Sequence, residues 1–187
     1  LCARSRPIAH GPVVADALPF NHSRVRRSPS RSGVSGFQPV ALAARENRLV
    51  RFTAAESPAL ALKNPRVWWP YRMGSPELYT LELEVEADGA VSDRQRVRFG
   101  VQEITSELTG KGHRLFKVNG KPLLIRGGGW ASDMLFRAAS RDRLEAEMRY
   151  VREMGLNTIR LEGKLETDEF YELADRNGIL LMPGWCC

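Results

Sequence analysis

The strongest constraint on the fold is an alternation of short apolar strands and amphipathic helices over the last third of the chain. The predicted strands are residues 123–125, 156–161 and 179–182. The first predicted helix is capped by Ser140 and closed by Gly155, and the second is capped by Thr167 and stops at Gly178. This order predicts parallel strands joined by right-handed crossovers, with the first strand buried on both faces.

Polar and aromatic residues follow the carboxyl ends of these predicted strands. Residues 127–133 follow the first strand, Arg160 and Glu162 lie at the end of the second, and Trp185 follows the third. Functional side chains occupy this position in a (β/α)8 barrel, so the pattern favours a barrel over a doubly wound sheet. Gly127-Gly128-Gly129 lacks the Gly-x-Gly-x-x-Gly spacing of a dinucleotide-binding turn that runs directly into a helix.

Residues 37–108 have the alternating pattern of a half-buried antiparallel sheet. In residues 79–86 apolar side chains alternate with Thr and Glu, and after the Asp88-Gly89 turn the return strand carries arginines at alternate positions. An acidic row is therefore expected to face a basic row on a solvated face of the sheet. Residues 49–53 also fit a strand, and residues 115–122 fit a small hairpin. We interpret residues 37–108 as the end of a β-sandwich.

The positive charge of the chain is concentrated in residues 1–36. The whole sequence has a net charge of +6, and six arginines against one aspartate give this segment +5 of it. The segment has no strand or helix periodicity, so we expect it to be disordered. It also lacks the interleaved aromatic residues that stack on bases, which disfavours nucleic acid as a partner. No run approaches the roughly 18 apolar residues of a membrane span, and no secretory signal is visible.

Several ordered motifs within residues 37–187 resemble glycoside hydrolases of family 2. They are Asn64-Pro65-Arg66-Val67-Trp68-Trp69-Pro70, Pro76-Glu77-Leu78-Tyr79, Phe99-Gly100-Val101, Asn119-Gly120-Lys121-Pro122-Leu123-Leu124-Ile125-Arg126-Gly127, Gly155-Leu156-Asn157-Thr158-Ile159-Arg160, Phe170-Tyr171 and Asp175-Arg176-Asn177-Gly178-Ile179-Leu180. Residues 127–133, 160–163 and 182–185 look most like the exo-β-D-glucosaminidases of that family, which remove glucosamine from the non-reducing end of chitosan. The continuation typical of β-galactosidases, His-Tyr-Pro, and the Trp-Gly-Gly-Gly typical of β-mannosidases are absent.

The resemblance implies a fold, a domain division and an activity. After a doubtful segment of residues 1–36, residues 37–108 would be the C-terminal part of an immunoglobulin-like β-sandwich. Residues 109–187 would be the first three strands of a (β/α)8 catalytic barrel, which is incomplete, so the chain is expected to be a fragment. The activity would be retaining hydrolysis of β-linked glucosamine by a secreted enzyme. The alternatives are another family 2 specificity such as that of β-mannosidases, and a non-catalytic carbohydrate-binding or scaffold protein.

The resemblance also implies roles for individual residues. Arg160 matches the arginine beside the nucleophile, where a cation keeps a carboxylate ionised. Asp133 matches an acidic position that lines the −1 subsite and suits a substrate with a C2 ammonium group, and Glu162 follows the same logic. Trp130 and Trp185 are candidates for stacking on sugar.

No catalytic acid/base or nucleophile is assigned within this chain. By the resemblance both come from later barrel strands, so the chain alone is expected to be inactive. Glu166, Asp168 and Glu169 surround a helix start, where carboxylates favour the helix dipole and a structural role. The cysteines and histidines lack metal-ligand spacing, and no metal, cofactor or membrane partner is expected.

Overall fold

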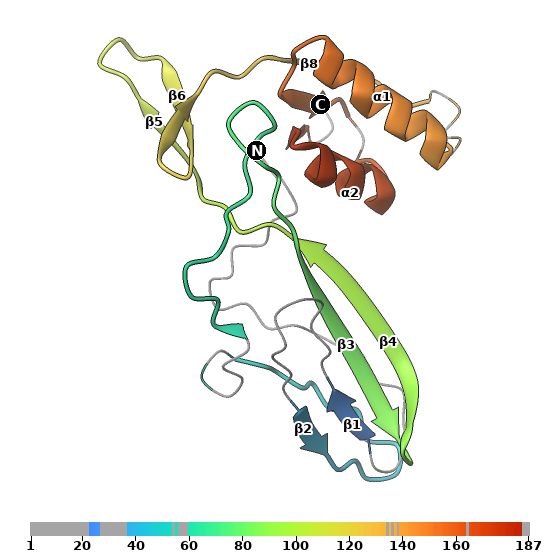
Figure 1. Cartoon of the computed structure of the whole chain (residues 1–187). Coiled ribbons are helices and arrows are strands. Elements are labelled where there is room, and N and C mark those ends of the chain that lie inside the picture. The colour runs from blue at the N-terminus through green and yellow to red at the C-terminus, as the bar shows by residue number, and fades with distance from the viewer. Residues whose placement is uncertain are drawn as a thin grey trace. The chain divides into compact units, whose positions relative to one another are not determined.

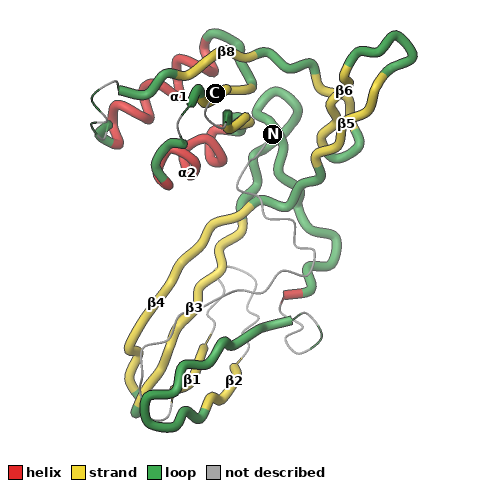
Figure 2. Tube along the Cα trace, turned by 180° about the vertical axis from the view of Figure 1, so that it is seen from behind, coloured by secondary structure: helices red, strands yellow, loops and turns green. Residues whose placement is uncertain are grey.

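The structure is a computed structural model that describes residues 23–26, 37–53, 55, 60–133, 135, 137, 139–163 and 165–184 (Figure 1). These residues form two compact units. The antiparallel-sheet unit comprises the described residues up to Pro65 together with Tyr79–Arg98. The parallel-sheet unit comprises Arg66–Leu78 and residues 99–184. Figure 2 shows the strands of each unit from the opposite side.

The antiparallel-sheet unit is built on a four-stranded sheet of order β2-β1-β3-β4. Its strands are β1 (Ser23–Arg26), β2 (Phe37–Val40), β3 (Tyr79–Ala87) and β4 (Ala90–Phe99). Asp88 and Gly89 connect β3 to β4 with positive φ angles of 52° and 80°, which confirms the predicted turn. Two ion pairs cross this hairpin, Arg94 to Glu84 at 2.6 Å and Arg96 to Glu82 at 3.4 Å. The predicted meeting of an acidic row with a basic row is therefore confirmed.

Two sequence predictions for this unit differ from the structure. Ser23–Arg26 lies inside the segment 1–36 expected to be disordered, yet it forms β1 and pairs antiparallel with both β2 and β3; the rest of that segment lies outside the described residues. Its pairing with β3 joins segments more than fifty residues apart, so the local composition gives no sign of it. Residues 49–53 are irregular rather than a strand. Val50 and Phe52 nevertheless pack with Leu83 in a small buried cluster, which accounts for their apolar pattern.

The parallel-sheet unit also contains, before its parallel strands, a three-stranded antiparallel sheet of order β5-β6-β7. Its strands are β5 (Ile104–Leu108), β6 (Arg114–Val118) and β7 (Lys121–Leu123). The predicted hairpin is confirmed by β6 and β7, whereas the predicted parallel strand at residues 123–125 is wrong. Leu123 ends β7 and Leu124 is 78% exposed. The first parallel strand starts four residues later, in a run of glycines that carries no apolar signal.

The rest of this unit has the predicted strand–helix–strand–helix–strand order. The elements are β8 (Gly127–Trp130), α1 (Arg141–Glu153), β9 (Thr158–Leu161), α2 (Asp168–Asn177) and β10 (Leu180–Pro183). The strands form a parallel sheet of order β10-β9-β8. The Ser140 hydroxyl accepts from the Arg143 N–H, and Gly178 ends α2 with a φ of 67°, so these predicted helix limits are confirmed.

The main core of this unit lies between the parallel sheet and the two helices. Its buried residues, none more than 5% exposed, are Leu144, Met148, Val151, Ile159, Leu161, Phe170, Leu173, Ala174, Ile179 and Leu181. Side chains alternate between the two faces of a strand, so Ile159 and Leu161 define the helix-covered face of the sheet. Thr158, Arg160 and Leu180 point to the opposite face, which we call the inner face.

Trp68 covers the inner face near Leu180, at the start of β10. This residue is buried in a cluster with Leu180 and Val118, and its indole N–H donates to the Asp175 carbonyl at 2.8 Å. Its backbone N–H donates to the Val101 carbonyl, also at 2.8 Å. Residues 66–78 therefore pack with the parallel-sheet unit, and the compact units differ from the predicted division at residue 108. Among the described residues, no helix is long and apolar enough to cross a membrane.

Candidate functional site

The candidate site lies at the carboxyl ends of the three parallel strands. Backbone hydrogen bonds hold these ends together: the Glu162 N–H donates to the Trp130 carbonyl at 3.2 Å, and the Gly184 N–H donates to the Leu161 carbonyl at 2.9 Å. The residues that follow each strand are thus presented along one edge. This is the edge at which functional residues gather in sheets of parallel strands connected by helices.

Arg160 and Glu162 share the inner face of the sheet. Arg160 lies in register between Gly129 of β8 and Met182 of β10, and both charged residues are exposed. The Arg160 Nε lies 3.8 Å from the position that a Cβ on Gly184 would take, so the guanidinium end reaches the end of β10. A cation and a carboxylate are therefore brought to one edge, as the sequence order predicts.

Trp130 points to the helix-covered face instead. Its ring centroid is 5.0 Å from that of Phe170, and its indole N–H donates to the Glu166 carboxylate at 3.3 Å. It packs against the main core. These contacts give Trp130 a structural role and separate it from Arg160 and Glu162, so sugar stacking by Trp130 is the least supported of the residue predictions. The other candidate for stacking, Trp185, lies outside the described residues.

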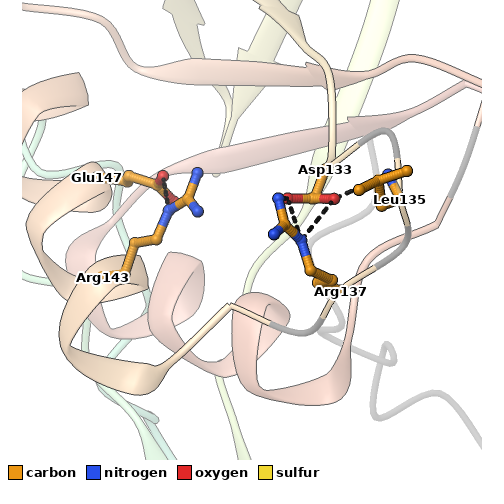
Figure 3. Close-up of polar contacts among 5 residues, drawn as sticks. All are labelled: Asp133, Leu135, Arg137, Arg143 and Glu147. Atoms are coloured by element: carbon orange, nitrogen blue, oxygen red, sulfur yellow. Dashed lines mark hydrogen bonds and ion pairs between the residues drawn. The ribbon is translucent and has the colours of Figure 1, made fainter.

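Asp133 lies in the loop after β8 and is held by two donors (Figure 3). Its carboxylate accepts from the Leu135 N–H at 2.8 Å and forms a bidentate pair with Arg137, whose Nη2 lies 2.9 Å from Oδ2. The Asp133 side chain is 17% exposed, whereas Arg137 is largely in solvent. Figure 3 also shows the neighbouring Arg143, which is paired with Glu147 at 2.9 Å.

These contacts determine the charge of Asp133. The hydrogen bond from Arg137 lowers the pKa of the Asp133 carboxyl, and the Leu135 N–H and the charge of Arg143 lower it further. Asp133 is therefore anionic throughout the neutral range. An ionised carboxylate in a loop beside the strand ends is suited to hold a cationic group, and in this structure it holds the guanidinium of Arg137.

The other carboxylates of this region have structural partners. Glu169 pairs with Arg141 of α1 at 2.9 Å, and Glu166 binds the Trp130 indole. They do not form a pair of facing acids. Among the residues that the structure describes, no group of three or more His, Cys, Asp or Glu side chains is arranged to hold a metal ion.

Asn157 organises the start of the parallel sheet, and the sequence reasoning gave it no role. It is buried; its side-chain oxygen accepts from the Arg126 N–H at 2.9 Å, and its amide donates to the Leu124 carbonyl at 2.9 Å. It thereby ties the chain entering β8 to β9. The signal that points to it is a polar amide placed directly before a buried strand. Arg137 was also missed, although its spacing of four residues from Asp133 indicates a local ion pair.

A hollow of about 650 Å³ lies elsewhere, between the two helices and Tyr71. Its lining includes Arg149, Arg152 and Arg176 together with two glutamates. None of the predicted site residues that the structure describes, Trp130, Asp133, Arg160 and Glu162, contributes to it. The hollow is therefore separate from the candidate site.

Comparison with known proteins gives consistent matches. Residues 32–102 match the family Glycosyl hydrolases family 2. An exo-β-D-glucosaminidase of Streptomyces avermitilis is 48% identical over 157 residues, which are 83% of this chain and 17% of that protein. A mannosylglycoprotein endo-β-mannosidase of Lilium longiflorum is 38% identical over 129 residues, which are 66% of this chain and 13% of that protein.

A comparison with solved structures agrees with these sequence matches. The crystal structure of the Amycolatopsis orientalis exo-chitosanase CsxA superimposes with a TM-score of 0.75 at 34% identity, over 94% of this chain and 22% of that one. The chain thus spans about a fifth of the length of the proteins it matches. The matches confirm the resemblance to family 2 glycoside hydrolases, and the glucosaminidase match has higher identity than the mannosidase match.

Proposed function

We propose that this chain is a segment of a family 2 exo-β-D-glucosaminidase, which hydrolyses β-linked glucosamine units from chitosan oligosaccharides. The antiparallel-sheet unit would be the C-terminal part of an immunoglobulin-like sandwich. The strands β8, β9 and β10 would be the first three of a (β/α)8 barrel. The observation that carries the proposal is the placing of Arg160 and Glu162 on the inner face at the strand ends, in a chain 48% identical to an exo-β-D-glucosaminidase.

The proposed chemistry is retaining hydrolysis by two carboxyl groups supplied by later strands of the barrel. In this arrangement Arg160 would lie beside the nucleophile. Its positive charge would keep that carboxylate ionised and ready to attack the anomeric carbon. This segment would supply electrostatic support and substrate recognition, and the chain alone would have no hydrolytic activity.

The proposed recognition elements are Asp133 and Glu162. Glucosamine carries an ammonium group at C2, whereas mannose and glucose carry a hydroxyl there. A carboxylate near C2 would stabilise the ammonium through a charge-assisted hydrogen bond and would offer much less to a neutral sugar. The lowered pKa of Asp133 supports this role, since the carboxylate keeps its negative charge through the neutral and mildly acidic range, in which the amine is protonated.

The experiment is a chimera in which this chain replaces the matching segment of the Streptomyces avermitilis enzyme. The substitution Asp133→Ala in that chimera is expected to lower kcat/KM for a p-nitrophenyl β-glucosaminide by about ten- to a hundredfold, the effect of losing one charged hydrogen bond. The β-mannoside rate is expected to change by less than threefold (on the order of 0.6 kcal/mol). Equal losses on both substrates would remove Asp133 from amine recognition.

A second assay tests the expected inactivity of the chain itself. Incubation of the 187-residue chain with chitosan oligomers is expected to release no glucosamine, while the unsubstituted chimera releases it. Release by the chain alone would mean that the catalytic carboxyl groups lie within these residues. It would contradict the proposal that later strands of the barrel supply them.

A further inference from the structure

The three consecutive glycines of β8 have different surroundings. A Cβ on Gly127 would collide with the backbone carbonyl oxygen of Thr158, and a Cβ on Gly128 would meet nothing within 4 Å. A Cβ on Gly129 would collide with the carboxylate of Glu162, at 2.8 Å from its Cδ and 3.4 Å from its Cγ. The missing side chain of Gly127 thus leaves space for the backbone of Thr158, and that of Gly129 leaves space for the side chain of Glu162. Gly128 borders open space.

The position of Glu162 explains this contact. Gly129 pairs in register with Arg160, and Glu162 follows two residues later on the same face. The Glu162 N–H donates to the carbonyl of Trp130, which holds the Glu162 backbone beside the end of β8. From there the carboxylate folds back over Gly129 and fills the volume that any other residue would use for its own side chain.

Backbone conformation does not account for glycine at this position. The φ angle of Gly129 lies outside the left-handed region that favours glycine, so an alanine could adopt it without strain. In a strand, glycine is less favourable than alanine because it loses more conformational freedom on folding. Glycine at this position leaves free the space that the Glu162 carboxylate occupies.

We propose that Gly129 is a positioning residue for sugar specificity: its missing side chain seats the Glu162 carboxylate over β8, in the orientation that favours a cationic sugar over a neutral one. This inference rests on the proposed function, because it takes Glu162 as a recognition element for the C2 ammonium group. It adds that the selectivity depends on the glycine opposite the carboxylate as well as on the carboxylate itself.

The substitution Gly129→Ala separates this role from a structural one. The three atoms nearest to the added methyl group all belong to the flexible side chain of Glu162, so we expect the fold to be retained while the carboxylate rotates away. The glucosaminide is expected to lose about ten- to a hundredfold in kcat/KM, mostly through KM, since a ground-state contact is lost. Gly128→Ala is the matched control, because its methyl group enters open space.

The first readout does not depend on substrate. In the 187-residue chain, the side-chain carboxyl carbon of Glu162 is followed by NMR over a pH titration in the parent, Gly128→Ala and Gly129→Ala proteins. The Gly129→Ala protein is expected to show a shifted Glu162 signal with an otherwise conserved spectrum, and the Gly128→Ala protein is expected to match the parent. An unchanged Glu162 signal in Gly129→Ala would overturn the inference and leave the proposed function to the Asp133 test.

The second readout is the ratio of glucosaminide to mannoside kcat/KM in the chimera. Gly129→Ala is expected to lower this ratio to the level of Glu162→Ala, with the mannoside rate unchanged. If Gly129→Ala moves Glu162 but keeps the parent ratio, while Glu162→Ala lowers it, then Gly129 does not position the recognition group. If Glu162→Ala also keeps the parent ratio, the recognition role proposed for Glu162 fails and the inference fails with it.

Discussion

The two units of the molecule bury their apolar side chains to different extents. Among the described residues, the buried cluster of the antiparallel-sheet unit contains three residues, and β4 is exposed along nearly its whole length. In the parallel-sheet unit ten residues, at most 5% exposed, fill the space between the sheet and two helices. Within the described residues, the parallel-sheet unit therefore has a core of its own, whereas the antiparallel-sheet unit shows mainly backbone pairing and ion pairs across its strands.

The largest expected effect is a difference between two identical truncations. Phe170→Ala opens a cavity in the core of the parallel-sheet unit and is expected to cost about 3–5 kcal/mol of unfolding free energy. Phe52→Ala, in the small cluster of the other unit, is expected to cost less than about 3 kcal/mol because the buried cluster around it is smaller among the described residues. Urea denaturation followed by amide hydrogen exchange assigns each loss to its unit. Equal losses would contradict the contrast between the two cores.

A smaller effect is expected at Asn157, where the parallel-sheet unit depends on buried polar contacts. Asn157→Ala leaves the Arg126 N–H and the Leu124 carbonyl without their side-chain partner. We expect a loss of about 2–4 kcal/mol, with hydrogen exchange accelerated in β8 and β9. Ser92→Ala in β4 is the matched control, since it removes only an exposed hydrogen bond to Val85 and is expected to cost less than about 0.5 kcal/mol. Similar losses at the two positions would remove the special role of Asn157.

The ion pairs of the antiparallel-sheet unit are expected to contribute still less. Each cross-strand pair is worth roughly 0.2–1 kcal/mol. The Glu84 side chain is only 10% exposed, so Arg94→Ala leaves a poorly hydrated carboxylate and should cost more than Arg96→Ala, whose partner is more exposed. Double-mutant cycles at low and high salt measure both couplings. A larger coupling for Arg96–Glu82 would reverse the expected order.

The smallest expected effect concerns the pH dependence of the Asp133–Arg137 pair. The folded chain lowers the pKa of Asp133, so the stability that the pair contributes is present above the ordinary pKa of an aspartate. It is lost as the pH falls through the lowered folded value. Arg137→Gln removes the main cause and is expected to raise the pKa of Asp133 toward its ordinary value, as followed by NMR titration. An unchanged titration would mean that Leu135 and Arg143 suffice to hold the charge.

The contrast between the units also explains which parts of the fold were predictable from sequence. Helix caps such as Ser140 and Thr167 are local signals, and the periodicity between them indicates both helices because a single face is buried. The strand β8 was missed because glycines carry no hydrophobic pattern, and the prediction moved to the apolar residues just before it. The strand β1 was missed because its own residues carry no strand pattern and one of its two partners, β3, is distant in sequence.

Some residues of the candidate site could be predicted from the sequence, and others could not. Arg160 and Glu162 follow from the rule that functional residues gather at strand ends, and the structure places both on the inner face. Trp130 follows the same rule but packs on Phe170, because the alternation of side chains sends it to the helix-covered face. The position of the Glu162 carboxylate over Gly129 depends on the register of β8 with β9, which no local sequence pattern specifies.

The most direct test of the central claim is the substrate preference of the chimera that carries this chain in the Streptomyces avermitilis enzyme. If the strand ends described here form part of a glucosamine-binding site, the chimera will hydrolyse a p-nitrophenyl β-glucosaminide with kcat/KM within about tenfold of the parent enzyme, a difference of about 1.4 kcal/mol. It will also strongly prefer that substrate to the β-mannoside. A folded chimera that prefers the mannoside, or that cleaves neither substrate, would contradict the assignment.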